Sequence, residues 1–170
     1  MYIRGSRLSR LLMPISVVVG MLPALSSSEA ATTSTTFAVQ LTITSTCVIN
    51  SASTLNFGSA GVLTANIDQT STIQVQCTNT TPYNVGLNAG TSTGATVTTR
   101  KMTNGAATVN YALYSDSGRT TNWGNTVGTD TVSQTGNGAS QAFTVYGRVP
   151  AQTTPAAAVY TDTITVTVTY

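Results

Sequence analysis

Ionisable side chains with catalytic potential are sparse in this sequence of 170 residues. It contains no histidine, the side chain that most often serves as a general base at neutral pH and as a metal ligand. Beyond residue 30 the acidic residues are four single aspartates, Asp68, Asp116, Asp130 and Asp162, and three of them adjoin turn residues. Acid–base catalysis and cation binding need carboxylates that converge. The sequence therefore predicts no enzyme, no metal site and no cofactor.

The two cysteines, Cys47 and Cys77, have the spacing of a structural crosslink. A redox-active pair needs close spacing and a cationic neighbour that lowers the pKa of one thiol, and neither feature is present. The chain also carries an export signal, described next, and exported proteins mature in an oxidising compartment where thiols pair. We therefore predict one disulfide, between Cys47 and Cys77.

The first thirty residues differ in composition from the rest of the chain. Three arginines between residues 4 and 10 precede an apolar run from residue 11 to residue 25, and small residues at positions 28 and 30 suit a cleavage site. This pattern predicts a signal peptide over residues 1–30. The run is about fifteen residues long, whereas a spanning helix needs about twenty apolar residues. No membrane insertion is expected after cleavage, which would leave a single domain.

Beyond residue 30 the charges cancel, because four basic residues balance the four aspartates. Nucleic-acid binding needs a basic surface that displaces counterions from phosphates, so no nucleic-acid partner is predicted. Arg100 and Lys101 are the one adjacent basic pair, and we interpret them as a solvated strand edge that discourages unwanted pairing. The four basic residues beyond residue 30 are Arg100, Lys101, Arg119 and Arg148.

Apolar and polar residues alternate along most of the chain, which is the period of strands with one buried face. No stretch beyond the signal has helical spacing. We also predict a strand near Thr96 to Met102, a hairpin turn at Asn104-Gly105 and a short strand around Thr129 to Ser133. Several short strands and one disulfide predict an all-β, immunoglobulin-like β-sandwich. The clearest alternating runs are Phe37 to Ile43, Ile73 to Cys77, Tyr83 to Leu87, Val109 to Leu113, Phe143 to Val149 and Thr161 to Tyr170.

Two of the most regular amphipathic runs lie at opposite ends of the predicted mature chain, and this placement leaves two interpretations. The first and last strands could pair within one domain. Alternatively, the sandwich lacks a final strand, and the first strand of a neighbouring copy fills the resulting groove by β-strand addition. Such a contact is heterologous, so it generates fibres. The alternating apolar residues are Phe37, Val39, Leu41 and Ile43 in the first run and Ile164, Val166, Val168 and Tyr170 in the last.

Six motifs in order along the chain resemble the spore coat protein U domain, a family that includes pilins of the archaic chaperone-usher pathway. The resemblance covers essentially all of the chain beyond the signal peptide. It rests on the order of the motifs, the cysteine spacing and the terminal strand together. The motifs are Thr46-Cys47-Val48-Ile49, Leu55-Asn56-Phe57-Gly58, Ile73-Gln74-Val75-Gln76-Cys77, Tyr111-Ala112-Leu113-Tyr114-Ser115-Asp116, Phe143-Thr144-Val145-Tyr146-Gly147-Arg148-Val149-Pro150 and the run from Tyr160 to Tyr170.

The resemblance implies an incomplete immunoglobulin-like sandwich whose missing strand is supplied by donor-strand complementation. Residues 31–46 would be the donor extension, with Phe37, Val39, Leu41 and Ile43 as its apolar side chains, and residues 47–170 the pilin domain. A periplasmic chaperone would lend the missing strand, and an outer-membrane usher would exchange it for the extension of another copy or a related pilin. The product would be a fimbrium at the cell surface that supports attachment or biofilm formation. The groove would be bordered by Ile164, Val166, Val168 and Tyr170.

Two other functions remain open from the sequence. One is a structural protein of a spore or cell coat, which would use the same strands. The other is a secreted carbohydrate-binding module with Trp123 as a stacking platform, although we predict that Trp123 is a core contact beneath a loop. The donor boundary is also open by two or three residues, because only Thr44, Ser45 and Thr46 separate the donor run from Cys47.

Overall fold

The structure is a computed structural model that describes residues 28–170, so most of the predicted signal peptide lies outside the described residues. Residues 41–170 form one compact unit, and the described residues before it, 28–40, are treated separately. Within the described residues there are eight strands and no helix. They are β1 (Cys47–Ala52), β2 (Ile67–Cys77), β3 (Pro82–Leu87), β4 (Arg100–Asn104), β5 (Ala107–Tyr114), β6 (Val132–Thr135), β7 (Ser140–Val149) and β8 (Val166–Thr169).

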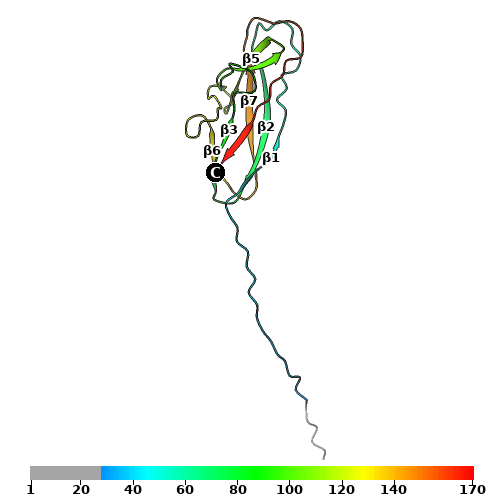
Figure 1. The fold of residues 1–170 in the computed structure, drawn as a ribbon, viewed down its shortest axis with the longest axis vertical. Coiled ribbons are helices and arrows are strands. Elements are labelled where there is room, and N and C mark those ends of the chain that lie inside the picture. The colour runs from blue at the N-terminus through cyan, green and yellow to red at the C-terminus, as the bar shows by residue number, and fades with distance from the viewer. Residues whose placement is uncertain (1–27) are drawn as a thin grey trace, which may run out of the picture. The chain divides into compact units, whose positions relative to one another are not determined.

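Two antiparallel sheets form the second unit (Figure 1). The larger sheet has the order β1-β2-β7-β5-β4, and the smaller has the order β6-β3-β8. The longest ladder joins β2 to β7, from the pair Ile67 and Val149 to the pair Gln76 and Ser140. One buried apolar cluster takes its side chains from both sheets, as the alternating pattern requires. The predicted all-β sandwich is confirmed.

Trp123 belongs to this core. Its side chain is 1% exposed, its indole N–H donates a 2.8 Å hydrogen bond to the carbonyl oxygen of Val85, and its ring meets the edge of Phe143. The indole N–H is thus satisfied without solvent, as a buried tryptophan requires. The predicted core position is confirmed, and a ring buried in this way cannot stack on a sugar. The interpretation as a carbohydrate-binding module loses its platform.

The interpretation of Arg100 as a solvated edge residue is wrong. Its side chain is 0% exposed, because β4 pairs Arg100 with Tyr111 and turns its side chain to the inner face, whereas Lys101 is only partly buried. Burial lowers the pKa of Arg100 to about 10, so the guanidinium is still charged at neutral pH. It donates hydrogen bonds of 2.6 to 3.0 Å to four backbone carbonyl oxygens, those of Leu87, Asn88, Val97 and Trp123.

Three strand bounds differ from the sequence prediction. The strand expected near Thr96 to Met102 begins only at Arg100, because residues 96–99 form a turn closed by reciprocal backbone hydrogen bonds between Thr96 and Thr99. The short strand expected at 129–133 is β6, which begins at Val132 because Asp130 is engaged in a turn with Thr126. The third difference concerns the terminal strand and is described with the site. The hairpin between β4 and β5 turns at residues 104–107 as predicted, with Gly105 at a φ of 57°.

Two aspartates at the surface, Asp68 and the partly buried Asp116, should make the stability of the domain depend on acid pH. A hydrogen bond from Arg148 lowers the pKa of Asp68, and the backbone N–H of Thr121 does the same for Asp116. A carboxylate with a lowered folded-state pKa stabilises the fold above its unfolded pKa, and that contribution disappears as the pH falls through the folded value. We expect the thermal midpoint to fall below a pH of about 3.8. Asp68→Asn should flatten that part of the profile, and an unchanged slope would contradict the assignment.

Candidate functional site

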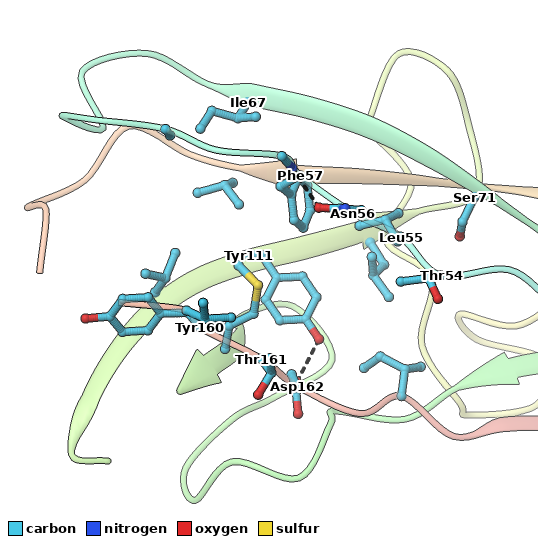
Figure 2. Close-up of a pocket in the computed structure, with 18 of the residues that line it drawn as sticks. Thr54, Leu55, Asn56, Phe57, Ile67, Ser71, Tyr111, Tyr160, Thr161 and Asp162 are labelled. Atoms are coloured by element: carbon cyan, nitrogen blue, oxygen red, sulfur yellow. Dashed lines mark hydrogen bonds between the residues drawn. The ribbon is translucent and has the colours of Figure 1, made fainter. Parts of the chain in front are cut away.

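An open apolar groove runs along one side of the second unit (Figure 2). Its volume is about 950 Å³. One rim consists of residues 52–61, which follow β1, and the other of residues 154–166, which lead into β8. Inward-facing side chains of β2, β5 and β7 form the floor, among them Ile73, Tyr111, Leu113, Val145 and Val149. The inner face of the larger sheet is therefore incompletely covered between the two rims.

The first rim is held against the sheet by a glycine on β7. A Cβ atom added to Gly147 would lie 2.8 Å from the Leu55 methyl groups and 2.9 Å from the end of the Phe57 ring, so any larger residue would push these side chains away from the strand. Phe57 meets the Tyr111 ring edge-on at a centroid distance of 6.1 Å. The turn that follows is closed by Asn56, whose side-chain oxygen accepts a 2.8 Å hydrogen bond from the N–H of Gly58. The rim is ordered without belonging to a strand.

The second rim is the terminal segment, and its strand is shorter than predicted. A strand was expected from Thr161 to Tyr170, but the ladder with β3 covers only Val166–Thr169. Thr161 instead forms an isolated bridge with Thr103 of β4, which belongs to the other sheet. Because the segment passes from one sheet to the other, neither β3 nor β4 pairs with its whole length. In the strand order β6-β3-β8, the outer edge of β8 has no partner strand among the described residues.

A polar pair interrupts the apolar lining near the middle of the second rim. The hydroxyl of Tyr111 donates a 2.7 Å hydrogen bond to the carboxylate of Asp162, and the two side chains point toward one another in Figure 2. Burial is the main cause that raises the pKa of Tyr111, and the bond to Asp162 adds to it. Tyr111 is therefore a neutral donor at physiological pH. The same carboxylate accepts bonds from the N–H and hydroxyl of Thr91, both at 2.9 Å.

The predicted site residues occupy three different settings. Ile164 and Val166 line the groove, whereas Val168 pairs with Val85 farther along β8 and Tyr170 is 60% exposed. The predicted disulfide between Cys47 and Cys77 is present and joins the first residue of β1 to the last residue of β2.

The predicted donor residues form no strand in this single chain. Residues 28–46 have no regular secondary structure, and the four apolar side chains are 76 to 86% exposed. Their role as a donor strand stays a prediction. These residues are Phe37, Val39, Leu41 and Ile43.

Sequence reasoning missed the residues that support the second rim. Asn88 and Thr91 contact the rim, at Thr165 and at Asp162, through side-chain hydrogen bonds that no alternating pattern reveals. The Asn88-Ala89-Gly90 turn motif did predict a loop at this position, but it did not predict that the loop contacts the second rim.

The groove is lined mainly by apolar side chains. Across residues 28–170 no three His, Cys, Asp or Glu side chains gather where they could hold a metal ion. Over the same range the structure has no helix long and apolar enough to cross a membrane. What the groove presents is an apolar floor beside the unpaired backbone edge of β8, which is the arrangement to which an extended peptide can add.

Fold and groove together define the class, an all-β sandwich left open along its terminal strand. The chain belongs to the Spore Coat Protein U domain family, which matches residues 33–167. This confirms the resemblance found in the sequence motifs. The chain is 34% identical over 164 residues to Protein U of Myxococcus xanthus, with 88% of this chain and 91% of that protein covered.

A solved structure shows the same fold. It is the pre-assembly complex of CsuC and CsuE, a chaperone and a tip adhesion subunit, from the archaic chaperone-usher Csu pili of Acinetobacter baumannii. One chain of that complex matches 76% of this chain with a TM-score of 0.55 and 27% identity. This chain spans only 40% of the length of that chain.

Proposed function

We propose that this protein is a non-catalytic structural subunit of a surface pilus, assembled head to tail by donor-strand exchange in a chaperone-usher pathway. The observation that carries the proposal is the apolar groove of about 950 Å³ beside the unpaired edge of β8. In the same chain, four alternating apolar side chains between residues 37 and 43 are exposed and lack a partner strand among the described residues. Among these residues the groove lacks a strand to cover it, and the extension lacks an apolar surface against which to pack.

The dimensions of the two features agree. A strand of seven residues, such as 37–43, extends about 20 Å at about 3.3 Å per residue, and the second rim, residues 154–166, has more than enough residues to lie beside it. Main-chain hydrogen bonds to the edge of the rim would give affinity, and alternate side chains would enter the groove. Burying four large apolar side chains is worth about 1.5 to 3 kcal/mol each before the cost of ordering the segment.

A second copy is the source of the strand, because the chain reaches its own groove poorly. Only Thr44, Ser45 and Thr46 lie between Ile43 and the start of β1. If these three residues turned the chain back, Phe37 would reach only as far as residue 53, at the start of the first rim. The extension would then lie along β1 and leave most of the groove empty. Exchange between copies is heterologous and does not close on itself, so it produces a fibre.

Before assembly, the groove would expose apolar surface to solvent, and such surfaces favour aggregation. A periplasmic chaperone that lends a strand would protect it, and an outer-membrane usher would exchange that strand for the extension of the next copy. The likeness to a chain of a chaperone–subunit complex supports the chaperone. The fibre would then lie at the cell surface and support attachment or biofilm formation.

A structural role in a spore or cell coat is the second candidate, favoured by the match to Protein U over 91% of its length. Both candidates use the same groove and extension, so their products differ in location rather than in chemistry. Antibody-gold labelling of intact cells distinguishes them. Thin filaments that project from the envelope support the pilus, and a continuous labelled layer supports the coat.

The strand-exchange step is tested by two substitutions on adjacent extension residues. Leu41→Asp places a charge on the apolar face of the extension, where burial without a partner is costly, and should abolish fibres. Gln40→Asp places the same charge on the opposite face and should leave fibres in place. Electron microscopy of material sheared from producing cells gives the readout. Fibres of normal length from Leu41→Asp would show that residues 37–43 are not the donor.

A further inference from the structure

Residues 162–165 of the second rim are held mainly by side-chain hydrogen bonds and not by a strand ladder. Thr161 is bridged to Thr103 at one end, and the β8 ladder with β3 begins at Val166 at the other. Between these points the rim is supported by the loop of residues 88–91, which follows β3. The loop therefore sets the position of residues 162–165 of the rim.

Asn88 continues the β3 ladder by one further pair. Its backbone N–H donates a 3.2 Å hydrogen bond to the carbonyl oxygen of Thr165, and its side-chain oxygen accepts a 2.9 Å bond from the N–H of Thr165. The same side-chain oxygen accepts a bond from the N–H of Gly90 at 3.1 Å, which fixes the loop to itself. The backbone of Thr165 is thus paired on the β3 side of the rim.

Asp162 is the second point of support. Its carboxylate accepts hydrogen bonds from the N–H and hydroxyl of Thr91 and from the hydroxyl of Tyr111, at 2.7 to 2.9 Å. Hydrogen bonds to an ionised acceptor are about twice as strong as neutral ones. Gly90 has a φ of 88°, and a Cβ atom at this position would overlap the Asp162 carboxylate. The loop accommodates the carboxylate only because residue 90 is glycine.

These contacts leave the opposite edge of the rim available. In an extended segment, the N–H and C=O groups of successive residues point to alternate edges. Thr161 and Thr165 use theirs on Thr103 and Asn88, so those of Ile164 and Val166 point to the groove side. A strand that enters the groove would meet these groups on a segment that is already fixed at Thr161, Asp162 and Thr165.

Arg100 binds the start of the same loop from the buried core. Its guanidinium donates hydrogen bonds to the carbonyl oxygens of Asn88, at 2.8 Å, and of Leu87, at 3.0 Å. The loop is therefore fixed to the buried core on one side and to the rim on the other. A rim that is held in place before the strand arrives avoids part of the ordering cost of binding.

We propose that Asn88, Gly90, Thr91 and Asp162 form a latch that holds residues 161–165 extended and so positions the rim to capture residues 37–43 of a second copy. The proposal rests on the proposed function. In it, Asp162 is a positioning residue, which acts through the rim rather than by contact with the incoming strand. Loosening the latch should shorten the residence of a bound strand more than it disturbs the empty domain.

The test uses a fluorescent synthetic peptide of residues 34–45 and the full chain. Its readouts are the dissociation rate of the peptide and the thermal midpoint of the peptide-free chain. Asp162→Asn should release the peptide roughly tenfold faster, which corresponds to about one lost charge-assisted hydrogen bond. Thr91→Val removes only the hydroxyl bond to Asp162 and should act in the same direction with a smaller effect.

Asp116→Asn is the matched control. Asp116 closes a turn through bonds to the N–H groups of Thr120 and Thr121, as Asp162 does with Thr91, but it does not line the groove. This variant should lower the thermal midpoint without changing peptide release. Unchanged release from both latch variants would overturn the latch and leave the proposed function intact. If Asp162→Asn does not fold, Thr91→Val alone decides. Absence of peptide binding to the parent chain would overturn the proposed function, and the latch with it.

Discussion

Replacing Arg100 with methionine is expected to lower the free energy of unfolding by about 3 to 5 kcal/mol, a large share of the stability of a small domain. The guanidinium donates hydrogen bonds to four carbonyl oxygens from three parts of the chain, at Leu87 and Asn88, at Val97 and at Trp123, and those to Leu87 and Trp123 are fully buried. Methionine fills much of the volume but donates nothing, and each buried acceptor left unpaired costs about 1 to 3 kcal/mol. Urea unfolding followed by circular dichroism measures the change.

The neighbouring residue offers the control. Lys101→Met removes a positive charge from the adjacent position of the same strand, but Lys101 is only partly buried and makes no ion pair among the described residues. Its unfolding free energy should stay within about 0.5 kcal/mol of the parent value. Arg100→Lys keeps the charge but loses the planar fork of donors, so an intermediate loss is expected. Equal stabilities for Arg100→Met and Lys101→Met would contradict the role assigned to the buried guanidinium.

The core of the fold was predictable because burial and alternation coincide in it. Along β7, every second residue from Phe143 to Val149 is buried, with Gly147 among them, and the residues between are more exposed, which is the pattern that the sequence displays. The same reasoning gave a wrong prediction for Arg100, because a charged side chain is normally exposed to solvent. Its burial depends on carbonyl groups at Asn88 and Trp123 that converge only in the folded chain.

The candidate site was predictable only in part, for a related reason. Alternation identified Ile164 and Val166, which line the groove, as members of a terminal strand. The opposite rim, residues 52–61, has no period because it is held by a turn and by close contact with Gly147 rather than by a ladder. The length of β8 was overestimated because alternation reports which side chains face inward, and it contains no information on which strand lies beside the backbone.

Loss of the disulfide is expected to be the second large effect. Cys47 and Cys77 lie 30 residues apart, and closing a loop of this size restricts the unfolded chain by about 3 to 4 kcal/mol in the loop-entropy account. In the folded domain, β1 is an edge strand that pairs only with β2 among the described strands. The bond ties the first residue of β1, next to the predicted extension, directly to the end of β2.

The prediction is tested by urea unfolding of three samples: the oxidised chain, the chain reduced with dithiothreitol, and the double variant Cys47→Ala with Cys77→Ala. The oxidised chain should unfold at the highest urea concentration. The last two should unfold at similar, lower concentrations, and this agreement controls for side effects of either treatment. Coincident transitions for the oxidised and reduced chains would contradict the expected contribution. If the extension transmits tension in a fibre, the bond delivers that tension to β2, whose ladder with β7 is the longest in the sheet, instead of to the single ladder of β1. Fibres of the double variant should then break at lower shear than parent fibres of the same length.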